Sequence, residues 1–386
     1  MRENVLFEIT KENLETGLRG IPVGYCVTSF VDPEKGLSYV GIPIGEITNQ
    51  EPIELIYLLY HSEMGSKEEV AQFQKELNER AHLKPETIQS IEALPQEGHA
   101  MDHFAAALLI AGMFEKTGDY REDCLGVIAK LPQIAALVIN THAGWGKTPE
   151  SKPKLGYIEN FLQMLSQPKE KGKEFIDMMK LFNVIHYDHS GGNLSAFVGK
   201  AVASGLEHMY GSLSAAMAAL AGPRHGGANQ ECLEFLKGIQ KELGNAAKPE
   251  DMEKLIREKL LKGEVIIGFG HAVLRVEDPR ATVCYDYCQK HFPDHPLVKL
   301  AFLLRSEGSK VLQENPKISN PHPNIDAMTG TMLTAGGFSF SDYYTVLFGL
   351  SRCVGIAIQI VYERLDARDG KGTPIVRPKY LYKPRK

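Results

Sequence analysis

Apolar and polar positions along the chain mostly follow the period of an α-helix. Apolar residues recur at every third or fourth position in 51–60 and 232–243, which predicts amphipathic helices there. The range 193–221 is rich in Ala, Ser and Gly, which predicts a long helix in close contact with other helices. Strand patterns are confined to 24–30 and 38–42, where we expect a small N-terminal β-hairpin. The predicted fold class is therefore all-α.

Clusters of glycine and proline divide these helices into blocks. Gly222–Gly227 contains a proline and paired glycines, three prolines lie within 316–323, and Gly336 and Gly337 form a third break. At roughly 150 residues per domain, the chain is long enough for two or three domains. The predicted division is a large helical domain, 1–227 with 337–386, and a smaller helical domain, 228–336.

The composition indicates a soluble globular protein that binds a small molecule. Of its 386 residues, 43% are hydrophobic and 24% charged, and the net charge of −5 gives no general attraction for nucleic acid. Six cysteines are too few for a disulfide scaffold. We find no signal-peptide pattern, and the longest apolar stretch, 346–361, is too short to span a membrane. We expect a cytoplasmic protein; a mature mitochondrial chain is the alternative.

Several short segments concentrate the residues capable of catalysis. His186 and His189 are three positions apart, a spacing that on a helix would suit a metal, although no further ligands with suitable spacing are evident. His225 is flanked by glycines, which leave its ring accessible to a ligand. Structural packing or capping is the alternative interpretation for His186, and an ordinary surface loop is the alternative for His225.

Charged residues near two helix starts indicate an anionic ligand and a base. Asp278 before a proline predicts a helix cap, which places Arg280 in the first turn, where anions bind favourably. Asp326 follows a proline-stiffened entry and fits either a general base or another cap. Arg352 lies in an almost wholly apolar helix, where a guanidinium requires a carboxylate partner. Arginines plus a carboxylate base suggest proton removal from carbon on a multiply anionic substrate.

Four segments together resemble the citrate synthase family. They are GPRHGGANQE (222–231), GFGHAVLRVEDPR (268–280), PNIDAMTG (323–330) and YYTVLFGLSR (343–352), and they occur in that family's order. The resemblance extends over about residues 14–380. It implies an all-α homodimeric enzyme of two domains, which joins acetyl-CoA to oxaloacetate and hydrolyses the citryl-CoA thioester, as in the tricarboxylic acid cycle. It implies no metal, no cofactor, no nucleic-acid partner and no membrane.

The resemblance also implies a role for each matching residue. Asp326 would be the base, His225 would stabilise the enolate and His271 would polarise the oxaloacetate carbonyl. The oxaloacetate ligands would be His189, Arg280, Arg352 and, donated by the other subunit, Arg377. The coenzyme A contacts would be Arg275, Gly268, Phe269, Gly270, Lys317 and Asn324.

Three other functions stay open from the sequence. A 2-methylcitrate synthase would use propionyl-CoA with the same residues, because one methylene is worth only ~1–3 kcal/mol of discrimination. A metal-dependent hydrolase would use His186, His189 and Asp326. A catalytically silent helical dimer is disfavoured, since every catalytic position is filled. The sequence also departs from the family pattern at Val40, commonly arginine, and at Ser190, commonly acidic.

Overall fold

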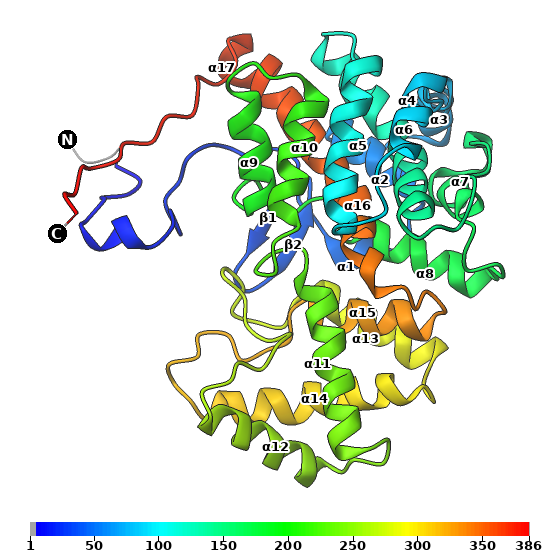
Figure 1. Ribbon diagram of the computed structural model, residues 1–386. Coiled ribbons are helices and arrows are strands. Elements are labelled where there is room, and N and C mark those ends of the chain that lie inside the picture. The colour runs from blue at the N-terminus through cyan, green and yellow to red at the C-terminus, as the bar shows by residue number, and fades with distance from the viewer. Residues whose placement is uncertain (1–4, 386) are drawn as a thin grey trace.

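The computed structural model describes residues 5–385 and consists mostly of helices (Figure 1). This confirms the expected all-α class. The α-helices are α1 (Ile44–Ile47), α2 (Pro52–His61), α3 (Lys67–Arg80), α4 (Pro85–Glu92), α5 (Ala100–Glu115), α6 (Tyr120–His142), α7 (Tyr157–Met164), α8 (Lys173–Val184), α9 (Leu194–Ala203), α10 (Met209–Leu220), α11 (Ala228–Leu243), α12 (Pro249–Leu261), α13 (Pro279–His291), α14 (Pro296–Gln313), α15 (Asp326–Ala335), α16 (Tyr344–Val361) and α17 (Ala367–Gly370). Short 3₁₀ turns are η1 (Glu12–Glu15), η2 (Pro153–Leu155) and η3 (Ser341–Tyr343), and η4 (Tyr362–Asp366) is a π-helix.

The expected hairpin is confirmed and carries a third short strand. Strands β1 (Ser29–Asp32), β2 (Gly36–Tyr39) and β3 (Ile42–Pro43) form an antiparallel sheet in that order, with Ser29 opposite Tyr39. The first strand begins later than predicted, at Ser29, and continues to Asp32. The chain turns at Val40 and Gly41, both with positive φ, so the residues before Thr28 lie beyond the end of the opposite strand.

The predicted long helix over 193–221 is wrong, because the chain forms two helices, α9 and α10. The break includes Leu206 with a φ of 68°, and the Nδ1 atom of His208 accepts a hydrogen bond from the Gly211 N–H at 3.0 Å, which caps α10. The predicted close packing holds nevertheless. A Cβ added to Gly199 would lie 3.0 Å from Ile356 of α16, so the missing side chain lets α9 approach α16.

Helix α16 lies at the centre of the molecule, and all its residues are buried. It packs against α6, α10 and α9, which surround it in Figure 1. Helix α6 and the helical run 341–370 around α16 are long and apolar enough to cross a membrane, but their surfaces are buried within the fold. They are therefore core helices, which places Arg352 in the interior.

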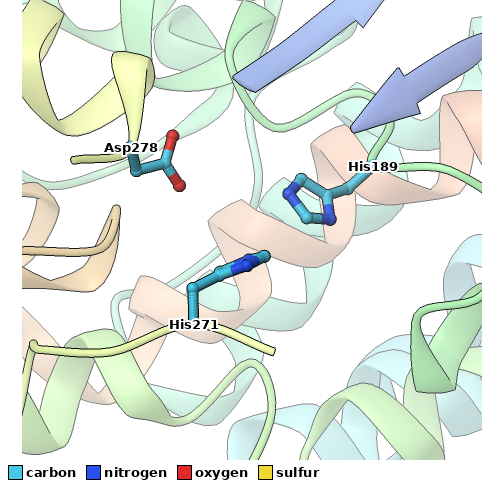
Figure 2. Close-up of side chains that lie close together, drawn as sticks. All are labelled: His189, His271 and Asp278. Atoms are coloured by element: carbon cyan, nitrogen blue, oxygen red, sulfur yellow. The ribbon is translucent and has the colours of Figure 1, made fainter. Parts of the chain in front are cut away.

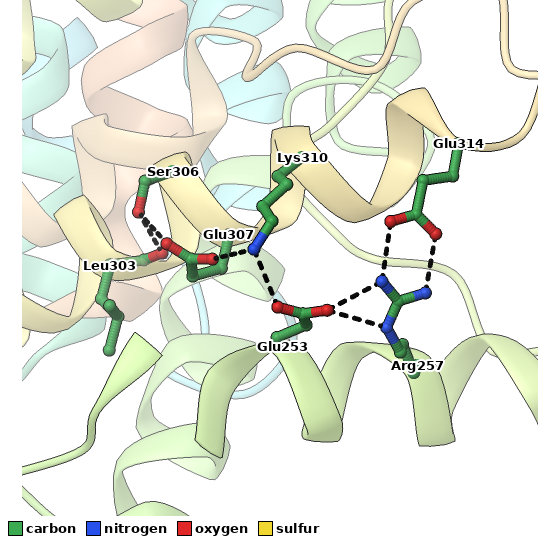
Figure 3. Close-up of polar contacts among 7 residues, drawn as sticks. All are labelled: Glu253, Arg257, Leu303, Ser306, Glu307, Lys310 and Glu314. Carbon is green, nitrogen blue, oxygen red and sulfur yellow. Dashed lines mark hydrogen bonds and ion pairs between the residues drawn. The ribbon is translucent and has the colours of Figure 1, made fainter. Parts of the chain in front are cut away.

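Helices α11 to α15 occupy the predicted small domain and pack on one another below the other helices in Figure 1. An ion-pair network joins α12 to α14 (Figure 3): Arg257 contacts Glu253 and Glu314, and Lys310 contacts Glu253 and Glu307. These side chains are mostly solvent-exposed, so each pair adds little by itself. The division into domains stays a prediction, and residues 1–4 and 386 of the predicted large domain lie outside the described residues.

The hairpin contacts both groups of helices. At its tip the Pro33 carbonyl accepts a hydrogen bond from the Arg275 N–H at 2.8 Å, and Gly36 packs directly on Pro279 of α13. At its base the buried Tyr39 hydroxyl donates to the Val184 carbonyl of α8 at 2.9 Å. The sheet thereby fixes the loop that precedes α13 relative to the loop that follows α8.

Candidate active site

Two histidines predicted from separate segments face each other in the structure. The rings of His189 and His271 have centroids 5.4 Å apart, and one ligand atom each of His189, His271 and Asp278 lie within 4.8 Å of one another. Figure 2 shows their side chains converging from the loop after α8 and the segment before α13. The interpretation of His186 and His189 as neighbours on a helix is wrong, because α8 ends at Val184 and both lie in the following loop.

The hydrogen bonds of His271 define which of its nitrogens carries a proton. The Nδ1 atom accepts the backbone N–H groups of Val273 at 3.0 Å and Leu274 at 2.9 Å. Burial and the nearby Arg280 lower the pKa of His271 to about 4, so the ring is neutral near pH 7. Its proton is therefore on Nε2, which makes that atom a hydrogen-bond donor.

His225 is held as a neutral donor in the same way. The backbone N–H of Ser195, at the start of α9, donates to His225 Nε2 at 3.2 Å, and the Ser195 hydroxyl lies 2.9 Å from the same atom. A backbone N–H can only donate, so the ring proton lies on Nδ1. Burial and Arg352 lower the pKa of His225 to about 4. The glycines after it permit close packing: a Cβ on Gly226 would lie 2.6 Å from the Leu220 carbonyl oxygen.

Asp326 begins α15 without capping it, so the alternative interpretation as a cap is not supported. The N-cap residue is Ile325, and the Asp326 N–H donates to the Asn324 side-chain oxygen at 3.0 Å. Burial raises the pKa of the Asp326 carboxyl to about 7, against the lowering effects of Arg280 and Arg352. A carboxyl with that pKa exchanges protons near neutrality, as a general base requires.

The loop Gly268–Gly270, just before His271, is hydrogen-bonded to the segment that carries Asp326. The Gly268 carbonyl accepts the Asn324 N–H at 2.9 Å, and the Asn324 side-chain amide donates to the Gly270 carbonyl at 3.0 Å. Phe269 pairs with Pro323 as an isolated β-bridge. Asn324 therefore connects the predicted coenzyme A loop to the start of α15.

Arg280 and Arg352 bring two buried guanidinium groups to the site. Arg280 is 2% exposed and paired with Asp278, whose carboxylate lies 2.6 Å from Nη2. Arg352 is also 2% exposed; its Nε donates to the His186 carbonyl at 3.0 Å and its guanidinium lies 4.7 Å from the centre of the Phe348 ring. Within residues 5–385, Arg352 forms no ion pair closer than 4.0 Å. Burial lowers the pKa of Arg352 to about 10, so it stays charged and suited to a carboxylate ligand.

The electrostatics favour an anion over a metal ion at the histidines. His189, His271 and Asp278 have ligand-type atoms close together, but Asp278 already pairs with Arg280. Burial, Arg280 and Arg352 hold the pKa of His189 well below its usual value. A divalent cation would enter next to two guanidinium groups, which repel it. The set proposed for a hydrolase gains no support, since His186 Nδ1 donates to the Phe182 carbonyl at 2.7 Å instead.

Three predicted ligands lie outside this cluster. The Arg275 side chain bonds the Val273 and Leu274 carbonyls of its own loop. Lys317 is exposed in the loop after α14, and Arg377 is exposed on the C-terminal segment, which runs away from the helices (Figure 1). Their predicted roles in binding coenzyme A or a partner's substrate stay predictions.

Sequence reasoning missed several residues that build the site. Asp278 was predicted only as a helix cap, a role it fulfils, yet it also orients Arg280. Asp188 adjoins His189 in the loop after α8, and Ser195 lies a few residues further on, at the start of α9. Nothing in their spacing indicated that Ser195 contacts His225 or that Asp188 bonds the His189 backbone. Their proximity to a predicted ligand was the one available signal.

Comparisons with known proteins identify the family to which the chain belongs. The family described as citrate synthase, C-terminal domain, matches residues 17–379. The chain is 37% identical to citrate synthase 4, mitochondrial, of Arabidopsis thaliana, over 97% of this chain and 82% of that one. It is 34% identical to the peroxisomal citrate synthase of Saccharomyces cerevisiae, over 96% and 84%.

Solved structures give the same result. The ternary complex of Thermoplasma acidophilum citrate synthase with carboxymethyl coenzyme A and oxaloacetate superposes with a TM-score of 0.83, at 25% identity, over 96% of each chain. The citrate synthase of Thermotoga maritima gives a TM-score of 0.80 at 25% identity, over 95% of this chain and 94% of that one. This protein therefore belongs to the citrate synthase family, whose members are acyltransferase enzymes.

Proposed function

We propose that the protein condenses acetyl-CoA with oxaloacetate and then hydrolyses citryl-CoA to citrate and coenzyme A. The observation that carries this proposal is the buried carboxyl of Asp326, with a pKa of about 7 and under the influence of Arg280 and Arg352. The same two arginines act on the neutral histidines, Arg352 on His225 and Arg280 on His271. The Thermoplasma relative was solved with oxaloacetate and carboxymethyl coenzyme A, which supports oxaloacetate and a coenzyme A thioester as the ligands here.

In the first step Asp326 takes a proton from the methyl group of the thioester. A thioester methyl is a very weak acid, so the step requires a donor at the oxygen where charge develops. The Nδ1 proton of His225 supplies this donor, and Ser195 orients the ring from the opposite side. Because His225 is neutral, it stabilises the enolate without carrying a full positive charge.

In the second step the enolate carbon attacks the carbonyl of oxaloacetate. The Nε2 proton of His271 is directed by the two backbone N–H groups at Nδ1 and polarises that carbonyl. Arg280, Arg352 and His189 bind the two carboxylates of oxaloacetate, and guanidinium pairs fix orientation as well as charge. The alkoxide that forms gains a proton through His271, which balances the proton taken by Asp326. Water then attacks the thioester carbonyl, the bond to sulfur breaks, and coenzyme A leaves as the thiol. The proposal requires no metal or cofactor.

Coenzyme A would lie along the Gly268–Gly270 loop, with Arg275, Asn324 and Lys317 as contacts. Closure of α11–α15 over the substrates would exclude water until condensation is complete. Arg377 would complete the site of a second subunit in a homodimer. The C-terminal segment that carries Arg377 also exposes apolar residues, including Ile375, Val376 and Tyr380. Their exposure supports burial of this segment against a partner subunit. The cytoplasmic location stays a prediction, since the relatives include mitochondrial and peroxisomal enzymes.

The test is release of coenzyme A thiol from acetyl-CoA and, separately, from propionyl-CoA, each with and without oxaloacetate. The proposal predicts release from acetyl-CoA that depends on oxaloacetate and survives a metal chelator. Faster release from propionyl-CoA would reassign the enzyme as a 2-methylcitrate synthase with the same mechanism. No release from either thioester, or loss of release with chelator, would contradict the proposal.

A further inference from the structure

We propose that Asp188 is a positioning residue for the oxaloacetate half of the site: its buried carboxylate fixes the loop that carries His189 and supplies the counter-charge of Arg352. This inference rests on the proposed function. Asp188 touches no substrate in this account and acts through its neighbours. Its side chain is completely buried, 0% exposed, and lies next to His189 in the loop after α8.

Three donors from separate parts of the chain converge on the Asp188 carboxylate. The Thr28 hydroxyl, just before β1, donates to Oδ2. The Gln359 amide of α16 donates to Oδ1 at 2.7 Å, and the His189 N–H donates to the same oxygen at 2.8 Å. The Asp188 N–H in turn donates to the Tyr39 hydroxyl at 3.2 Å. Asp188 thus joins the hairpin, the central helix and the His189 backbone at a single buried group.

The loop after Asp188 is fixed on both sides of His189. Ser190 has a φ of 61°, a conformation that is unfavourable for a residue with a side chain. Its N–H donates to the Ser29 hydroxyl at 2.6 Å, and its carbonyl accepts from Gln359 at 3.3 Å. Helix α16 approaches closely here: a Cβ on Gly355 would lie 2.8 Å from Asp188 Cβ. The ring of His189 therefore has little freedom to move away from His271.

Asp188 also compensates the charge of Arg352. The two groups lie at the same junction: Arg352 Nε donates to the His186 carbonyl, two residues before Asp188, and Gly355, three residues after Arg352, packs on Asp188. Among the charged groups acting on Arg352, Asp188 opposes most strongly the effect of burial, which lowers the pKa of that guanidinium. Arg352 is buried and lacks an ion pair within the described residues, so an uncompensated charge there would be costly. A neutral residue at 188 would leave the Arg352 charge without this compensation. Asparagine at 188 would also weaken the hydrogen bond that holds the His189 N–H, because its one acceptor oxygen carries no charge.

The experiment compares Asp188→Asn with Asp123→Asn. Asparagine matches aspartate in shape, so the first change removes the charge and keeps the volume. Asp123 is likewise buried, at 3% exposed, but it bonds Thr117 and Gly118 near the start of α6. Oxaloacetate binding is measured by calorimetry without any thioester, KM for acetyl-CoA and kcat by thiol release, and the free energy of unfolding in urea.

The proposal predicts that Asp188→Asn raises the Kd of oxaloacetate on the order of 10-fold or more, because misplaced binding groups are costly. KM for acetyl-CoA should stay within about 2-fold, since the thioester contacts are elsewhere. Asp123→Asn should lower stability and leave the Kd of oxaloacetate unchanged. Thr28→Val removes one donor to Asp188 and keeps the charge, so it should also raise the Kd of oxaloacetate. If Asp188→Asn does not fold, the Kd measured in Thr28→Val tests the positioning role.

An unchanged or lower Kd of oxaloacetate in a folded Asp188→Asn protein would overturn the positioning role. If only Thr28→Val folds, an unchanged Kd in that variant would overturn it as well. Failure of the wild-type protein to bind oxaloacetate would instead contradict the proposed function, on which the inference rests. The two failures are distinguishable, because the first appears only in the variants.

Discussion

The carboxylate of Asp278 holds the guanidinium of Arg280, two residues further along, through two hydrogen bonds: from Nε to Oδ1 at 3.0 Å and from Nη2 to Oδ2 at 2.6 Å. The two residues act in opposite directions on Asp326, since Arg280 lowers the pKa of that carboxyl and Asp278 raises it. Burial is the largest influence and brings the pKa to about 7. The ion pair thus orients Arg280, and the opposing effects of its two charges leave the pKa of Asp326 near neutral pH.

The rate should depend on pH through Asp326. Its pKa is raised from the ordinary value, and only the carboxylate can accept a proton, so activity should be lost as pH falls through about 7. His225 and His271, with pKa values lowered to about 4, stay neutral over this range. Initial rates at low concentrations of both substrates, measured against pH, test this. A rate that stays constant down to pH values near 5 would contradict it.

In the Asp278→Asn variant, the loss of activity on acidification should occur at lower pH than in the wild-type protein. Removing the negative charge eliminates one influence that raises the pKa of Asp326, so the base stays ionised in more acidic solution. KM for oxaloacetate should rise, because Arg280 loses its bidentate partner. Asp286→Asn, an exposed aspartate on the same helix, is the matched control and should change neither quantity. If the pH at which activity is lost were unchanged or higher in Asp278→Asn, this role for Asp278 would be excluded.

The sequence predicted the parts of the site that lie in recognisable segments. His225, His271 and Asp326 adjoin glycine or proline breaks, and Arg352 was conspicuous as a charge in an apolar helix. The contacts of Ser195 with His225 could not be predicted, because they join residues 30 positions apart through tertiary packing. For the same reason the fold class was predictable from helical periodicity, whereas the break between α9 and α10 depended on a local cap at His208.

Gly268→Ala should lose both stability and activity. Gly268 has a φ of 88°, and an added Cβ would lie 2.7 Å from Cys232 Sγ and 3.1 Å from Ala327 Cα, next to Asp326. Gly263 has a similar φ of 76° with no atom within 4 Å of such a Cβ, so Gly263→Ala carries the backbone strain alone, about 1–2 kcal/mol. Urea unfolding and thiol release of both variants separate strain from steric conflict. Equal losses in the two proteins would contradict the packing argument.

His225→Ala should lower kcat by about 10²–10³, the usual effect of removing one donor to a developing oxyanion. Ser195→Ala should have a smaller effect, because the backbone N–H of residue 195 still donates to His225 Nε2. Steady-state kinetics with acetyl-CoA measure both. If Ser195→Ala were as damaging as His225→Ala, the backbone donor would not be what sets the tautomer of the ring.

The proposed role of Arg377 in the site of a second subunit predicts complementation between two inactive proteins. Arg377→Ala and Asp326→Ala should each be inactive as homodimers. In a mixed dimer one site combines the intact Asp326 of one subunit with the intact Arg377 of the other, so an equal mixture should recover about a quarter of wild-type activity. Co-refolding followed by the thiol assay measures this. No recovery, with mixed dimers shown to form, would place Arg377 in the site of its own chain or outside both.

The central claim is that Asp326 is the base, and its most direct test is Asp326→Asn. Asparagine keeps the shape of the side chain and cannot take the methyl proton. The measurement is oxaloacetate-dependent thiol release from acetyl-CoA at pH 8, with Asp286→Asn as the control and oxaloacetate binding as the check on folding. The account predicts that Asp326→Asn binds oxaloacetate and loses ~10²–10⁴-fold in kcat. An Asp326→Asn protein with near wild-type kcat would contradict it.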